Sequence, residues 1–120
     1  MANRSSGLGE ILVRAHQPQP PVDRASFGPR RGICQCHHGL GQRYPVAEVW
    51  GHHLIGTESP WNRDPVDLRH PGRETWMGCR RCRKIRLVDC ALVRAALRRG
   101  EHKINIDEVA TDTVRAVSWP

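Results

Sequence analysis

The sequence predicts a small α+β protein: a β-hairpin core stapled by a zinc ion, two C-terminal helices and a flexible N-terminal arm. Three observations carry this prediction. The chain has 120 residues, of which 38% are hydrophobic, so its apolar core should be small and in need of a metal or disulfide. Its five cysteines include two closely spaced pairs, a pattern typical of metal binding. Apolar residues recur at helical spacing after the second pair.

The N-terminal arm is expected to cover residues 1–32, and the zinc-binding domain residues 33–120. Residues 17–32 (QPQPPVDRASFGPRRG) are rich in proline, glycine and arginine, a composition typical of an extended linker. No stretch approaches the roughly 18 apolar residues of a membrane span, and the N-terminus lacks a secretory signal. The odd cysteine count, together with the two cysteines in metal-ligand spacing, favours a reducing cytosol and metal thiolates over disulfides. We therefore expect a cytoplasmic protein.

Short strands are expected at residues 46–50 and 53–55, on either side of a break at Gly51, and at residues 74–77. Residues 56–73 hold several prolines and glycines and should form a long irregular loop. An alternating segment at residues 85–88 follows the second cysteine pair.

Two C-terminal helices complete the expected fold. The first covers residues 90–99, with Asp89 as N-cap and Gly100 as its stop. The second begins at Asn105, where Glu108 completes a capping-box pattern. Its apolar residues fall on one helical stripe: Ile106, Val109, Ala110, Val114 and Val117.

The cysteine pairs predict a structural metal site. Cys79 and Cys82 have the spacing at which two thiolates reach one metal ion, and two more ligands close the tetrahedron. Residues 34–39 (CQCHHG) supply them. Cys34 and Cys36 would give four thiolates, whereas Cys34 with His37 would give three thiolates and an imidazole. We favour four cysteines because thiolate is the stronger zinc ligand, with His37 as the alternate.

His38 is also within reach of such a site but is expected to stay solvated. Cys90, beside Leu92 in the first helix, is interpreted as a half-buried helix residue.

Positive charge is concentrated beside the second pair. Residues 77–100 (MGCRRCRKIRLVDCALVRAALRRG) contain eight basic residues against Asp89 alone, which gives +7, the formal charge of the entire chain. We call the residues that flank this pair the basic knuckle: Arg80, Arg81, Arg83, Lys84 and Arg86. A positive patch of this density predicts a polyanionic partner, either nucleic acid or an acidic face of the transcription machinery.

Two ligand pairs framing a hairpin over residues 33–100 resemble zinc-ribbon and treble-clef domains, which commonly bind nucleic acid or the transcription and translation machinery. The resemblance implies a non-enzymatic zinc-binding protein that acts through its basic knuckle. An adaptor that binds an acidic protein would have the same sequence features.

A second resemblance is to HNH endonucleases. The segment 49–55 (VWGHHLI) lies between the cysteine pairs, where that family keeps its catalytic base. The resemblance implies His53 as general base and His52 as ligand of a catalytic divalent ion. The chain departs from the family because Thr75 or Trp76 stands where asparagine is expected. A metal-dependent nuclease is therefore the enzymatic alternative.

A third resemblance is to WhiB-like regulators, iron–sulfur transcription factors of actinobacteria that bind a sigma factor of RNA polymerase. It rests on the cysteine pair at 79–82 and on residues 89–97 (DCALVRAAL). It implies an iron–sulfur cluster with Cys90 as a ligand, and a sigma-type protein partner. The spacing to Cys90 is longer than in the family. Arginine makes up 17 of the 19 basic residues, and with this likeness it favours an actinobacterial or phage regulator.

Overall fold

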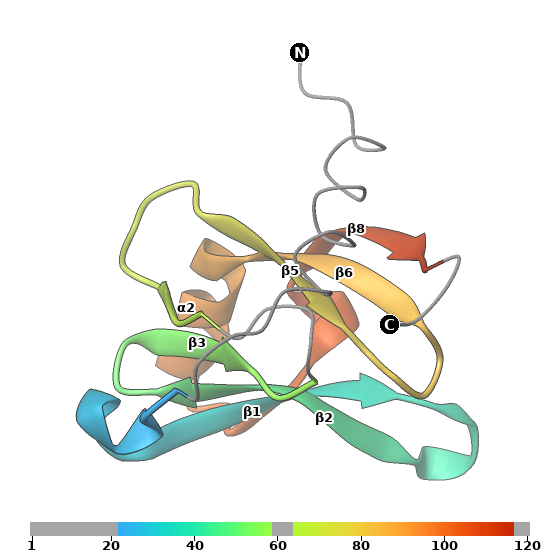
Figure 1. The fold of residues 1–120 in the computed structure, drawn as a ribbon, viewed down its shortest axis with the longest axis horizontal. Helices are drawn as coiled ribbons and strands as arrows, with labels where there is room; N and C mark the ends of the chain where they lie inside the picture. The colour runs from blue at the N-terminus through green and yellow to red at the C-terminus, as the bar shows by residue number, and fades with distance from the viewer. Residues whose placement is uncertain (1–21, 59–63, 117–120) are drawn as a thin grey trace.

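The protein is mostly β, as the computed structural model of residues 22–58 and 64–116 shows (Figure 1). Within these ranges it has eight strands in two sheets and a single α-helix. The predicted α+β fold with two C-terminal helices is therefore wrong. The strands are β1 (Arg30–His37), β2 (Arg43–Trp50), β3 (His53–Gly56), β4 (Val66–Asp67), β5 (Glu74–Gly78), β6 (Lys84–Asp89), β7 (Lys103–Asn105) and β8 (Ala110–Arg115).

The first sheet has the strand order β4-β3-β2-β1-β7. Its strands run antiparallel, except that β7 pairs in parallel with β1, with Cys34 opposite Ile104. The second sheet has the order β5-β6-β8 and is antiparallel throughout. Figure 1 shows this smaller sheet lying across the first. The strands expected at residues 46–50, 53–55 and 74–77 are confirmed as parts of β2, β3 and β5.

The core lies between the two sheets and beneath the helix. Alternate residues of β1, among them Cys34 and Cys36, are buried, as the two-residue period of a strand requires. They join one cluster with side chains of the second sheet and the helix, such as Met77, Val88 and Val93. Both cysteines of β1 therefore lie on its inner face.

The helix α2 (Cys90–Arg98) confirms the first helical prediction. The Asp89 carboxylate accepts a hydrogen bond from the Ala91 N–H at 2.8 Å and caps the N-terminus. At the other end Gly100, with φ +85°, donates to the Leu97 carbonyl, and the following N–H donates to Ala96. These two bonds form a Schellman motif, which ends the helix where the glycine predicts.

The second predicted helix is wrong. Asn105 does act as a cap, accepting from the Asp107 N–H at 3.0 Å, but it caps only the 3-10 turn η3 (Ile106–Glu108). The chain then continues as β8, which pairs with the edge of β6. Thr111 and Thr113 favour a strand because their β-branched side chains suit a pleated surface. The pairing also satisfies backbone groups of β6 that a helix would leave unpaired. The last expected stripe residue, Val117, lies outside the described residues.

The described part of the predicted arm is structured near the domain. β1 begins at Arg30, ahead of the expected start at residue 33, and the 3-10 turn η1 (Arg24–Phe27) precedes it. This turn packs against the β2–β3 connection, where Gly51 has φ +56°. A Cβ at that position would collide with the Phe27 carbonyl oxygen, so the close approach requires glycine. No helix in the described ranges has the length and apolar composition of a membrane span.

Candidate metal centre

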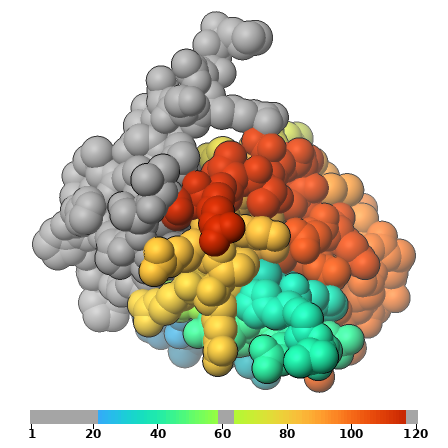
Figure 2. All heavy atoms as spheres, turned by 90° about the vertical axis from the view of Figure 1, so that its right-hand side faces the viewer, coloured from blue at the N-terminus to red at the C-terminus, as the bar shows by residue number. Residues whose placement is uncertain are grey.

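Two chain segments far apart in sequence meet at one end of the molecule. The loop between β5 and β6 lies against the tip of the β1–β2 hairpin, which turns through the 3-10 segment η2 (Gly39–Gly41). Figure 2 shows this end, with the gold β5–β6 loop beside the turquoise β1–β2 hairpin. Each segment brings two side chains to the contact.

The β5–β6 loop is closed by backbone hydrogen bonds. The Cys79 N–H donates to the Lys84 carbonyl at 2.9 Å, and the Arg83 N–H donates to the Cys79 carbonyl at 2.8 Å. Arg83 completes the turn in the left-handed region, with φ +58°, which costs a non-glycine residue about 1–2 kcal/mol. The tight loop presents Cys79 and Cys82 to the same point in space.

Four side chains converge there: Cys36, His38, Cys79 and Cys82. One ligand atom from each lies within 4.8 Å of all the others. The Cys36 and Cys82 sulfurs are 3.7 Å apart, and the Cys79 sulfur is 3.6 Å from His38 Nε2. All five cysteines are free thiols. In residues 22–58 and 64–116, no second group of three or more His, Cys, Asp or Glu side chains comes together in this way.

These distances fit a single tetrahedral ion. Zinc binds thiolate sulfur at about 2.3 Å and imidazole nitrogen at about 2.0–2.1 Å, so a regular tetrahedron separates two sulfurs by about 3.8 Å and sulfur from nitrogen by about 3.6 Å. The Cys36–Cys82 and Cys79–His38 separations in the structure lie within about 0.1 Å of these values. The site can therefore hold a metal with little rearrangement.

Burial disfavours the ionised form of two of the three thiols. Burial raises the pKa of Cys36 to about 12, against the opposing charge of Arg86. Burial also raises the pKa of Cys79. A metal ion would displace both protons on binding, so metal uptake should release protons to solvent.

Cys82 differs from its neighbours. Burial opposes its ionisation, but hydrogen bonds from the Lys84 backbone N–H, from His38, from Arg86 and from Cys36 outweigh burial and lower the pKa of Cys82 to about 6. This cysteine is therefore a thiolate near neutral pH and the natural first ligand for an incoming cation.

Arg86 supports the site from inside. Its side chain is 4% exposed, its Nη1 lies 3.7 Å from the Cys82 sulfur, and its Nε donates to the Asp107 carboxylate at 3.0 Å. The sequence predicts this residue as part of the phosphate-binding surface. Because it lies on the inner face of β6, the structure places its charge against the sulfur instead.

The structure brings together three of the four predicted ligands: Cys36, Cys79 and Cys82. In place of the fourth, Cys34, it brings His38. Cys34 lies on the same face of β1 as Cys36 but deeper in the core, where burial raises its pKa to about 12. His37, the alternate, is exposed because the next residue of a strand points to the opposite face. His38 follows the end of β1 and reaches the site.

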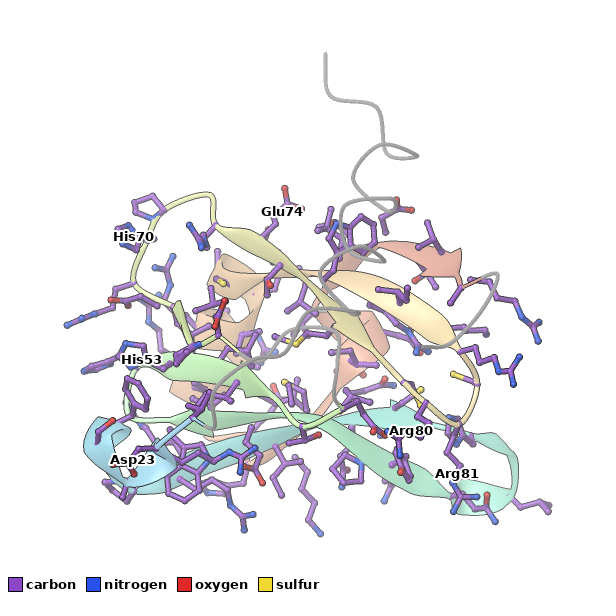
Figure 3. The ribbon with its side chains drawn as sticks, in the orientation of Figure 1. Asp23, His53, His70, Glu74, Arg80 and Arg81 are labelled. Carbon is purple, nitrogen blue, oxygen red and sulfur yellow. The ribbon has the colours of Figure 1, made fainter. Side chains whose placement is uncertain are left out.

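The residues of the two family resemblances lie elsewhere. Cys90 is buried at the start of α2 and is not part of the group. His53 lies at the far end of the molecule from Arg80 and Arg81 (Figure 3), with its ring 4.2 Å from that of Phe27. Neither His53 nor its neighbour His52 belongs to a group of metal-binding side chains in the described ranges.

The rest of the basic knuckle is exposed: Arg80, Arg81, Arg83 and Lys84. The Arg81 guanidinium lies 5.2 Å from the centre of the Tyr44 ring, a cation–π contact. A hollow of about 230 Å³ beside the metal centre is lined by both residues with His38, Gln42 and Arg43. The candidate metal ligands and the exposed basic side chains therefore lie at the same end of the protein.

Comparisons with protein-family models, with curated proteins and with solved structures found no match to the chain. The likenesses to zinc-ribbon domains, HNH endonucleases and WhiB-like regulators therefore stay predictions from sequence.

Proposed function

We propose that this is a non-enzymatic zinc-binding protein whose exposed knuckle arginines bind the phosphates of nucleic acid. The observation that carries the proposal is the compact group of three sulfurs and one imidazole nitrogen directly beneath exposed basic side chains. A metal ion there would fix the backbone of the β5–β6 loop, from which the exposed basic side chains project.

Zinc is the metal that this donor set favours. Three thiolates and one imidazole are a common set of ligands for structural zinc, and soft sulfur donors disfavour magnesium and calcium. In an iron–sulfur cluster the thiolates are distributed over different iron atoms, so their sulfurs stand farther apart than on one ion. The 4.8 Å limit among all four ligand atoms therefore favours a single zinc ion.

Nucleic acid is the partner that the surface favours. Arginine forks bind phosphate through paired hydrogen bonds, and Arg43 on the neighbouring hairpin extends the positive surface beyond the knuckle. Arg81 stacks on Tyr44, which holds its guanidinium in place. Contacts of this kind recognise the backbone and not the base sequence.

A salt titration tests the proposal. Each neutralised phosphate contributes about −0.9 to the slope of log K against log salt concentration on duplex DNA. Replacing Arg81, Arg83 and Lys84 together by glutamine should flatten that slope by about 2 to 3. The control removes the same charge elsewhere, through Arg24→Gln, Arg73→Gln and Arg99→Gln, and should leave most of the slope intact.

Zinc content is measured in both triple variants so that loss of metal is not mistaken for loss of a phosphate contact. Equal slopes in the two variants would overturn the proposal and make an acidic protein the better partner.

A further inference from the structure

A second concentration of positive charge lies away from the metal centre. A hollow of about 280 Å³ is lined by Arg31 of β1, by Gly51 and His52 of the β2–β3 turn, by Leu68 and Arg69 after β4, and by Arg94, Leu97 and Arg98 of α2. We call it the arginine hollow. The β2–β3 turn leads directly into His53, which Figure 3 places at the opposite end from Arg80 and Arg81.

The charge in the arginine hollow is only partly neutralised. Arg69 is held by Asp67 through two hydrogen bonds of 3.0 and 2.9 Å. Arg31, Arg94 and Arg98 form no ion pair with any carboxylate in residues 22–58 and 64–116. The remaining segments contain one acidic side chain, Glu10. No acidic residue lines the hollow.

Arg94 is the anchored member of this group. Its Nη1 donates to the Leu68 carbonyl at 2.7 Å, which fixes the direction of the guanidinium. Its Nε is buried and has no acceptor among the described residues. Two more guanidinium groups, those of Arg31 and Arg98, lie around the same hollow. Like charges at short range repel one another, so an anion that entered the hollow would stabilise all three cations.

The shape of the hollow narrows the class of anion. Guanidinium groups from β1 and from α2 can approach one phosphate from different directions with paired donors. Leu97, which is half-buried, adds apolar surface to the lining, which suits the sugar or base attached to a phosphate better than a bare ion. We infer that the arginine hollow binds the phosphate group of a nucleotide, either free or within a nucleic-acid chain. The inference does not depend on the metal centre or on the basic knuckle.

The test is an NMR titration of the full chain with three probes: inorganic phosphate, adenosine 5′-monophosphate and a short single-stranded DNA. Saturable amide shifts are expected at Gly51, His52, Arg94 and Arg98. Arg31→Gln and Arg98→Gln change exposed side chains and should keep the fold, and each should weaken binding about tenfold. Arg94→Gln should weaken it at least as much, provided its circular dichroism matches the wild type.

Arg99→Gln is the matched control. Arg99 neighbours Arg98, but it is paired with Glu101 at 2.7 Å and does not line the hollow, so its loss should change the affinity little. Adenosine monophosphate binding tighter than the DNA would identify a free nucleotide as the ligand, and the reverse order a nucleic-acid chain. No saturable shift with any probe, or an equal loss in the control, would overturn the inference. Binding that survives Arg81→Gln separates this site from the basic knuckle.

Discussion

His38→Ala and Cys34→Ala should have opposite effects on metal and on fold. His38 supplies one of four ligand atoms but is only half-buried, whereas Cys34 is fully buried and lies outside the group. Loss of the His38 imidazole should therefore weaken metal binding and leave the stability of the metal-free protein nearly unchanged. Loss of Cys34 should weaken the fold and leave the metal affinity unchanged.

The magnitudes follow from the geometry. Structural zinc sites bind with an apparent free energy of about 10–16 kcal/mol, so one of four ligands contributes about 2.5–4 kcal/mol, or roughly a hundredfold to a thousandfold in affinity. Removing the Cys34 sulfur deletes one heavy atom from a packed core, which costs about 1 kcal/mol of unfolding free energy. The two effects are large enough to be measured separately.

Competition with a chromophoric zinc chelator measures the zinc affinity, and urea denaturation of the protein in chelator measures the free energy of unfolding. Replacing Cys36 by alanine is the positive control for ligand loss. If Cys34→Ala released zinc while His38→Ala kept it, the four-thiolate set would be correct and the described geometry of the site would be refuted.

Two further predictions concern residues that support the site and the fold. Arg86→Gln should weaken zinc binding about 10–100-fold because the Cys82 sulfur loses its charged donor. Arg83, exposed in the β5–β6 loop, is the control, and Arg83→Gln should leave the zinc affinity unchanged. Equal zinc affinities of the two variants in chelator competition would contradict this role of Arg86. Gly51→Ala should lower the unfolding free energy by more than the roughly 1–2 kcal/mol of a left-handed alanine, since its Cβ would meet the Phe27 carbonyl. Gly72 has φ +68° and open space around it, so Gly72→Ala should show the backbone cost alone. If urea denaturation gave the two variants equal losses of unfolding free energy, the collision at Gly51 would be excluded.

The features that the sequence predicted well depend on neighbours along the chain. The pair Cys79 and Cys82 meets within one tight loop, and both ends of α2 are set by Asp89 and Gly100. Such local signals need no knowledge of the remaining fold. The capping signal at Asn105 was also real, but the helix ended after one turn. The following residues pair as β8 with the edge of β6 and so satisfy backbone groups of β6 that a helix would leave unpaired.

The fourth ligand and the position of Arg86 required the tertiary structure. Cys34 and Cys36 have the same inward direction in β1, and only the place where the second sheet crosses decides which of them meets the loop. His38 enters because β1 ends at His37 and the chain turns back. Arg86 lies on the central strand of the smaller sheet, so its charge faces the interior, where Asp107 and the Cys82 sulfur compensate it.

The ligands come in pairs from different sheets, and this arrangement has a consequence for how the chain folds. Cys79 and Cys82 can bind an ion as soon as their loop forms, whereas Cys36 is 46 positions from Cys82. Closing a loop of that length costs about 3 kcal/mol in chain entropy. An ion already held by the local pair would offset this cost by capturing the β1 hairpin when it arrives. We therefore expect zinc to bind the local pair first and to cross-link the two sheets when the β1 hairpin docks. Refolding in excess zinc should then be faster than refolding in chelator.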